Sequence, residues 1–204
     1  MRLGLLGGTF DPPHFGHLWL AETARAQLRL DQVLFLPAGE PPHKQARPVT
    51  AVSHRLRMLE LALPPSPHFH LDTTDADRPP PHTTAGLLPL LQQAHPGAQL
   101  WLLIGSDSLR DLPTWVTPRE IVPRYRLAVL PRPGVSIDWS VLETAVPGVR
   151  TAVDWLDGPQ LPLSSTAIRE WAGAGRSVRF LLPDPVAAYI AAHRLYDTSQ
   201  MGHG

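Results

Sequence analysis

Segments with the pattern of a strand alternate with segments with the pattern of a helix, and this alternation restricts the fold more than any other feature. The strand-like apolar runs lie at 2–6, 32–37, 68–72, 99–105, 125–134 and 150–156. The helical patterns lie at 16–29, 51–63, 84–95, 165–173 and 185–194. Because a helix between two strands favours a right-handed crossover, this order predicts an α/β fold with a mostly parallel sheet and helices on both faces.

The loops after the strands are where a ligand is expected in such a fold. In open parallel sheets, ligands bind outside the carboxyl ends of the strands. The loops at those ends lie at 7–16, 37–50, 73–84, 105–118, 131–138 and 157–165. Functional residues are therefore sought there first.

The composition narrows the class of protein. The 204 residues show no break that would separate two domains, so we predict a single domain over 1–204 with the C-terminal helices 165–195 packed on it. Eighteen basic and 18 acidic residues give a net charge of zero, which argues against a nucleic-acid-binding module. No apolar run approaches the ~20 residues that span a bilayer, so no membrane partner is expected. The absence of cysteine excludes disulfides and thiolate chemistry and fits a cytoplasmic protein.

The stretch GGTFDPPHFGH at 7–17 joins the first expected strand to the first expected helix. Glycines after the strand let backbone amides approach a ligand, and the helix N-terminus favours an anion. His14 and His17 are three residues apart, so in the first helical turn they share one face. The stretch predicts an anion site, with an ordinary strand-to-helix turn as the alternative.

A second stretch, PLSSTAIREW at 162–171, also begins a helix. Ser164 or Ser165 can cap that helix, and Arg169 then lies near its first turn, where a cation opposes the helix dipole. A bound polyphosphate would reverse this penalty. The alternative is a plain helix cap with a solvated arginine.

Five motifs in this order resemble one enzyme family. They are GGTFDPPHFGH at 7–17, PPHK at 41–44, IGSDSL at 104–109, LPTW at 112–115 and SSTAIR at 164–169. The first is typical of the His-x-Gly-His nucleotidyltransferases, and the five together resemble the bacterial nicotinate mononucleotide adenylyltransferases. The resemblance spans nearly the whole chain and implies a Rossmann-like fold. It also implies that the 5′-phosphate of nicotinate mononucleotide attacks the α-phosphorus of ATP, giving deamido-NAD and pyrophosphate as a step of NAD biosynthesis.

The resemblance implies roles at the ATP site. His14, His17 and Arg169 would be catalytic, with both histidines on the ATP phosphates. Lys44 would neutralise phosphate charge, unless it is simply a solvated lysine. The full set of implied ATP-binding residues is Gly8, Thr9, Phe10, His14, His17, Lys44, Ser164, Ser165, Thr166 and Arg169. Mg²⁺ would enter with ATP, and no metal site of the protein's own is expected, because the other histidines lack metal-ligand spacing.

The resemblance implies a second set of residues for nicotinate mononucleotide. Trp115 would stack on the pyridine ring, or else pack in the core. Asp107 would contact a ribose, or else cap the helix that follows, and Arg132 would face the cleft, or else lie in solvent. Thr83 and Thr84 would offer backbone amides to the carboxylate. Thr83 stands where the family often has an aromatic residue, which puts the ring contact on this side in doubt.

Several other functions remain open from the sequence. The nearest is an adenylyltransferase for nicotinamide mononucleotide, or for both acid and amide. A pantetheine-phosphate adenylyltransferase shares only the first motif. A nucleotide-binding regulator without catalysis is an alternative of another class. A homo-oligomer is compatible with the resemblance, and the sequence leaves the oligomeric state open.

Overall fold

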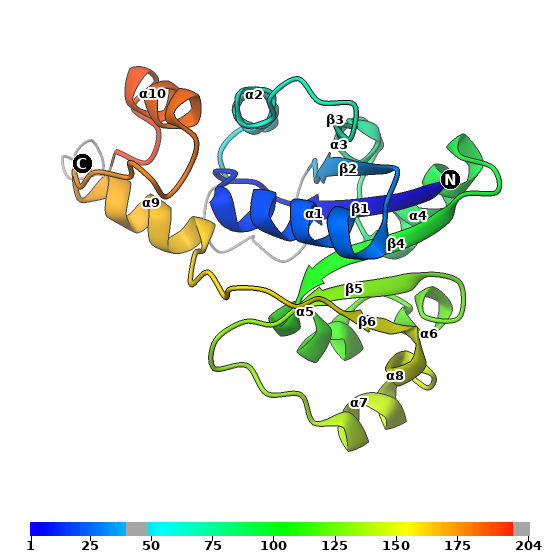
Figure 1. Cartoon of the computed structure of the whole chain (residues 1–204). Coiled ribbons are helices and arrows are strands. Elements are labelled where there is room, and N and C mark those ends of the chain that lie inside the picture. Colours follow the sequence, from blue (N-terminus) through cyan, green and yellow to red (C-terminus); the bar gives the residue numbers. More distant parts are fainter. Residues whose placement is uncertain (40–48, 198–204) are drawn as a thin grey trace.

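The fold is organised around one six-stranded sheet in which every strand is parallel to its neighbours (Figure 1). The structure is a computed structural model that describes residues 1–39 and 49–197. Its strands are β1 (Arg2–Gly8), β2 (Gln32–Pro37), β3 (Phe69–Leu71), β4 (Gln99–Gly105), β5 (Arg126–Leu130) and β6 (Val153–Trp155). Their order in the sheet is β3-β2-β1-β4-β5-β6. This is the strand order of the Rossmann fold, so the predicted fold class is confirmed.

The five predicted helices are present, and shorter ones occur in the loops. The long helices are α1 (Phe15–Leu28), α2 (Val52–Ala62), α4 (Thr84–Ala94), α9 (Ser165–Gly173) and α10 (Asp184–Ala192). The short ones are α3 (Thr74–Asp77), α5 (Ser106–Arg110), the 3₁₀ turn η1 (Leu112–Thr114), α6 (Pro118–Ile121), α7 (Trp139–Ala145) and α8 (Val149–Ala152). The periodicity did not predict these short helices, because so few residues do not complete an amphipathic repeat.

Two apolar cores lie on opposite faces of the sheet. Side chains alternate between the faces of a strand, so Leu102 belongs to the core under α4 and Leu103 to the core under α1. All residues of β4 after Gln99 are buried. This explains why the sequence of β4 is a continuous apolar run.

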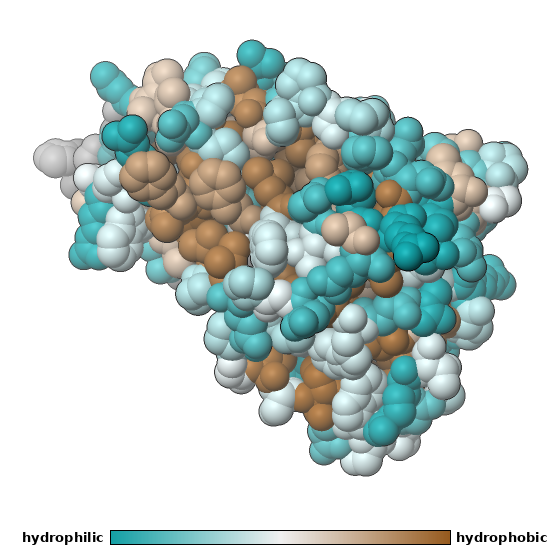
Figure 2. Space-filling model, in the orientation of Figure 1, coloured by the Kyte–Doolittle hydropathy of each residue, from teal (hydrophilic) through white to brown (hydrophobic). Residues whose placement is uncertain are grey.

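A third apolar cluster joins the C-terminal helices to the rest of the molecule. It contains Met58 of α2, Ile168 of α9 and Val186 of α10, all nearly fully buried. Figure 1 shows α10 beside α2, and Figure 2 shows apolar surface around these helices on the same face. None of the helices within 1–39 and 49–197 is long and apolar enough to cross a membrane. The single domain over 1–204 stays a prediction.

The strand order places the carboxyl ends of β1 and β4 at the centre of the sheet. The chain leaves β1 toward β2 on one side, and β4 continues toward β5 on the other. The loops that follow these two adjacent strands therefore leave in opposite directions and open a crevice between them. This crevice is the usual ligand position in such sheets. Gly8 and Gly105 end these two strands.

Candidate active site

The two histidines of the first motif form a stacked pair at the N-terminus of α1. Their ring centroids lie 3.8 Å apart. His14 is the N-cap, and its Nδ1 accepts the backbone N–H of Gly16 at 3.1 Å. The backbone N–H of His14 in turn donates to Nδ1 of His17 at 3.2 Å. The pair therefore makes a reciprocal cap in which imidazoles replace the usual hydroxyl and carboxylate.

These contacts fix which ring nitrogens can serve a ligand. A nitrogen that accepts a backbone N–H carries no proton, so a neutral imidazole here has its proton on Nε2. Burial, and to a smaller extent the Arg132 guanidinium, lowers the pKa of His14 from 6.5 to about 4. His14 is therefore neutral at pH 7 and offers Nε2–H as a donor. At the positive end of the α1 dipole, this donor suits an anion.

Phe10 shapes the backbone between β1 and the histidines. Its φ of 51° is uncommon for a residue other than glycine, and its ring is almost completely buried. The ring lies 4.9 Å from the ring of His17 and packs against Gly8, where a Cβ would approach it to 3.3 Å. The predicted residues Gly8, Thr9 and Phe10 thus lie directly beside the histidine pair.

The second motif contacts the first through the loop at Asp11 and Pro12. Ser164 caps α9, since its Oγ accepts the N–H of Ala167 at 3.2 Å. The Ser165 hydroxyl donates to the Pro12 carbonyl at 2.8 Å. Arg169 donates to the Asp11 carbonyl at 2.7 Å and to the Thr166 hydroxyl at 3.2 Å. The start of α9 is therefore bonded to the loop that leads to His14, and the residues predicted on α9 and α1 lie close together.

A cavity of about 290 Å³ opens next to this place, at the carboxyl ends of β1, β2 and β4. Its lining includes Gly8, His82, Thr83, Thr84 and Trp115. Thr83 caps α4, with its hydroxyl accepting the N–H of Gly86 at 3.2 Å. The walls are mostly apolar side chains, leucines the commonest among them, with a few polar groups, as small-molecule sites usually are.

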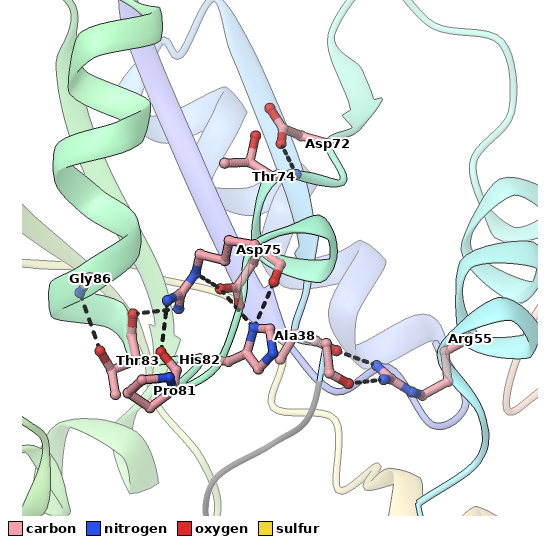
Figure 3. Close-up of polar contacts among 11 residues, drawn as sticks. Ala38, Arg55, Asp72, Thr74, Asp75, Pro81, His82, Thr83 and Gly86 are labelled. Carbon is pink, nitrogen blue, oxygen red and sulfur yellow. Dashed lines mark hydrogen bonds and ion pairs between the residues drawn. The ribbon is translucent and has the colours of Figure 1, made fainter.

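Arg78 holds the loop that carries the two threonines. It donates to the Asp75 carboxylate at 2.6 Å and to the carbonyls of Pro81 and Thr83 at 2.7 and 2.9 Å. His82 is buried, and its Nδ1 lies 2.7 Å from the Asp75 carbonyl, so Nδ1 must donate (Figure 3). The edge of the cavity is thus fixed by an ion pair and three hydrogen bonds to carbonyls.

Asp107 and Arg132 meet at the ends of β4 and β5, outside the lining of the cavity. Asp107 Oδ1 and Arg132 Nε lie 3.2 Å apart. A Cβ at Gly105 would collide with both side chains, which explains the glycine at the end of β4. The alternative of a helix cap is wrong for Asp107, because the N-cap of α5 is Gly105 and no side chain caps that helix.

Arg55 is the residue of this region that the sequence reasoning missed. It is the largest fully buried side chain and donates to the carbonyls of Thr9, Ala38, Gly39 and Thr50. Figure 3 shows it against Ala38, at the start of the loop after β2. It joins the loops after β1 and β2 beside the site. Lys44, predicted to bind phosphate, lies outside the described residues.

Comparisons with known proteins agree with this geometry. A family model described as cytidylyltransferase-like matches residues 5–171. A protein of Thermomicrobium roseum named "probable nicotinate-nucleotide adenylyltransferase" is 45% identical over 197 residues, or 97% of this chain and 92% of its own length. A protein of the same name from Roseiflexus sp. RS-1 is 43% identical over 95% of this chain and 97% of its own.

The chain belongs to the nicotinate-nucleotide adenylyltransferase family.

A solved structure supports the fold independently of the sequence motifs. The Plasmodium falciparum nicotinic acid mononucleotide adenylyltransferase, complexed with NaAD, has a TM-score of 0.77 to this chain at 18% identity. The match covers 96% of this chain and 97% of that one. Membership of the family confirms the resemblance inferred from the five motifs.

Proposed function

We propose that this protein transfers the adenylyl group of ATP to nicotinate mononucleotide, producing deamido-NAD and pyrophosphate. The observation that carries the proposal is the His14–His17 pair, in which both Nδ1 atoms are occupied by backbone N–H groups. The neutral form of each ring then carries its proton on Nε2, which would donate to phosphate. Together with the adjoining cavity, this pair supports an anionic nucleotide lying next to a planar apolar group.

The reaction needs positioning and charge stabilisation more than a nucleophile from the protein. A phosphate oxygen of nicotinate mononucleotide forms a bond to the α-phosphorus, and the bond from that phosphorus to the bridging oxygen of pyrophosphate breaks. His14 and His17 would donate to the α-phosphoryl oxygens as negative charge develops on them. A neutral donor suits this role, because it needs no proton exchange during the step.

The triphosphate would extend from α1 toward the N-terminus of α9. There the amides of the first turn, Thr166 and the remaining N–H groups of Arg169 would bind the β- and γ-phosphates. Ser164, Ser165 and Lys44 belong to the same proposed ATP site. Gly8, Thr9 and Phe10 would supply backbone contacts where the two nucleotides meet.

Nicotinate mononucleotide would place its ring in the cavity. Trp115 would stack on the ring. The Thr83 N–H already donates to the Pro81 carbonyl at 3.0 Å, so the Thr84 amide and the N-terminus of α4 would receive the carboxylate, with Thr83 beside it. Asp107 and Arg132 would contact the ribose and phosphate from the ends of β4 and β5. Because Arg132 lies close enough to His14 to lower its pKa, it would serve the reacting phosphates more than the ring.

Mg²⁺ would enter bound to ATP and neutralise part of the phosphate charge. Within residues 1–39 and 49–197, no three histidine, aspartate or glutamate side chains form a group that could hold a metal ion. Phosphate oxygens and water would therefore supply most of its ligands, as is common for this ion. A cytoplasmic location and a homo-oligomer also belong to the proposal.

The substitution His17→Ala tests the catalytic role. We expect pyrophosphate release to fall at least 100-fold, the usual cost of losing one donor to a developing anion. ATP binding, measured by calorimetry, should change far less, because His14, Arg169 and the N-terminus of α9 remain. An unchanged rate of pyrophosphate release would contradict this role and favour a regulator that only binds nucleotide.

A further inference from the structure

The loop between β1 and His14 is held by side chains from distant parts of the chain. Its carbonyls at Thr9, Asp11 and Pro12 accept from Arg55, Arg169 and Ser165, as described above. The N–H of Phe15 donates to the Leu181 carbonyl at 3.1 Å. The start of α1 is therefore anchored to the C-terminal part of the molecule.

The carboxylate of Asp11 is a further anchor that the proposed mechanism does not use. Asp11 is only 3% exposed. Its Oδ1 accepts the hydroxyl of Tyr196 at 2.7 Å, and its Oδ2 accepts the N–H of Thr50 at 3.3 Å. A buried carboxylate is costly unless its oxygens are hydrogen-bonded, so these two donors are necessary for Asp11 to remain inside.

Tyr196 reaches Asp11 from just beyond the end of α10. Its φ of 70° lies in the left-handed region that residues other than glycine seldom adopt. Burial, followed by the charge of Asp11 and the hydrogen bond to it, raises the pKa of Tyr196 above its ordinary value. The phenol therefore keeps its proton and stays a donor throughout the working pH range.

The backbone between Asp11 and His14 is stiff. Pro12 and Pro13 are the only residues between them, and proline fixes φ. A shift of Asp11 therefore moves the N-cap of α1 and the ring stacked on it. We propose that Tyr196 is a positioning residue for the His14–His17 pair, acting through the carboxylate of Asp11.

The test rests on the proposed function and compares two tyrosines of the C-terminal segment. Tyr196→Phe removes the donor to Asp11. Tyr189→Phe is the matched control, because its hydroxyl makes a similar contact of 2.8 Å with His54, which has no described contact with the loop. Both variants lose one hydroxyl that binds the C-terminal segment, and only one of them loosens Asp11.

We expect Tyr196→Phe to lower kcat about tenfold or more while both KM values stay within about twofold, since misplacing a catalytic group affects the transition state most. Tyr189→Phe should keep kcat within about twofold of the wild type. A double variant with Asp11→Asn should lose no more than the worse single variant, because the two residues act through one hydrogen bond. Equal kcat values for the two tyrosine variants would overturn the proposal. Should Tyr196→Phe not fold, the same split of kcat and KM is measured on Asp11→Asn.

A second readout does not depend on turnover. The ¹⁵N shifts of the His14 ring report its tautomer, which should be Nε2–H in the wild type and in Tyr189→Phe. In Tyr196→Phe the shifts should move toward a mixture of tautomers. If wild-type protein releases no pyrophosphate with nicotinate mononucleotide, the proposed function fails, and unchanged His14 shifts in Tyr196→Phe separately overturn the positioning role.

Discussion

At the scale of single residues, the two ring nitrogens of His14 differ in their environment. Nδ1 caps α1, and Nε2 is the nitrogen proposed to donate to phosphate. The sequence predicts that the histidines share one face if both lie in the first helical turn, and the structure makes His14 the N-cap instead. Their charge was open from the sequence, because a helix end disfavours a cation and a phosphate favours it. Burial decides the question for the protein without ligand, since it lowers the pKa of His14 to about 4.

This low pKa predicts a specific acid sensitivity. Between about pH 6.5 and pH 4 the unfolded chain binds a proton at His14 and the folded chain does not, so stability is present above this window and is lost as the pH falls through it. A shift of this size corresponds to about 3 kcal/mol. His14→Asn keeps a cap acceptor and removes the titration.

The measurement is the free energy of unfolding by urea at several pH values. Wild-type stability should fall between pH 6.5 and pH 4, and the variant should lose less over the same range. Parallel pH profiles for the two proteins would show that His14 is not buried in its neutral form. The variant should also lack pyrophosphate release, because its amide does not reach where Nε2 lies.

At the scale of elements, α2 shows where amphipathic periodicity misleads. The apolar spacing predicts a face made by Val52, Leu56, Leu59 and Leu63. Leu59 is buried, but Val52 is 36% exposed, and the buried positions on α2 include Arg55. The sequence does not indicate that Arg55 is buried. The carbonyls that accept its hydrogen bonds come from loops, and only the folded structure brings these loops to the helix.

The burial of Arg55 predicts a large difference between two arginines on one helix. Arg55→Met leaves four carbonyls without their donor and should cost about 3–5 kcal/mol of unfolding free energy. Arg57 is the control, because it is 55% exposed and pairs only with Glu60 on the surface. Arg57→Met should change stability by less than about 1 kcal/mol.

Urea denaturation of both variants checks this prediction. Burial lowers the pKa of Arg55, but the guanidinium keeps its charge. The loss of unfolding free energy should therefore not depend on pH between about 6 and 9, where arginine stays protonated. Similar losses for the two variants would mean that the loops after β1 and β2 hold their positions without Arg55.

The loops show the same limit of sequence reasoning. Each strand and each long helix of the described residues lies within a few residues of a predicted segment, because the strands carry apolar runs and the long helices a periodic apolar pattern. The first residues of the predicted strand run at 150–156 belong to α8 and not to β6. It could not show that Arg78 and Asp75 build the edge of the cavity, since such a network depends on three-dimensional proximity. It did indicate Thr83, Thr84 and Trp115, and the fold brings all three to one cavity.

At the scale of the whole molecule, the strand order explains why distant motifs meet. The first motif follows β1, the IGSDSL motif at 104–109 lies at the end of β4, and the neighbouring positions of these strands put both loops at the centre of the sheet. The C-terminal motif comes to the same place because α9 and α10 pack on α2 through the third apolar cluster. From the sequence alone, the meeting of these motifs could be predicted only from the resemblance to a known family.

The preference between acid and amide would depend on the groups at the N-terminus of α4. Thr83 uses its hydroxyl to cap α4 and offers no ring to the pyridine, so selection of the carboxylate would rest on backbone amides and the N-terminus of α4. This predicts a preference for the acid that comes from charge and hydrogen bonding. Stacking would come from Trp115 alone among the residues proposed here.

The most direct measurement is pyrophosphate release from Mg-ATP with nicotinate mononucleotide, run beside nicotinamide mononucleotide and phosphopantetheine. We predict release with the acid at a kcat/KM at least about 100-fold above the amide, the size expected when a site built for one polar group meets its analogue. Phosphopantetheine should give none. Equal rates with acid and amide would contradict the assignment of the carboxylate to the Thr84 amide and the N-terminus of α4. Release with phosphopantetheine alone, or with none of the three, would contradict the proposed reaction.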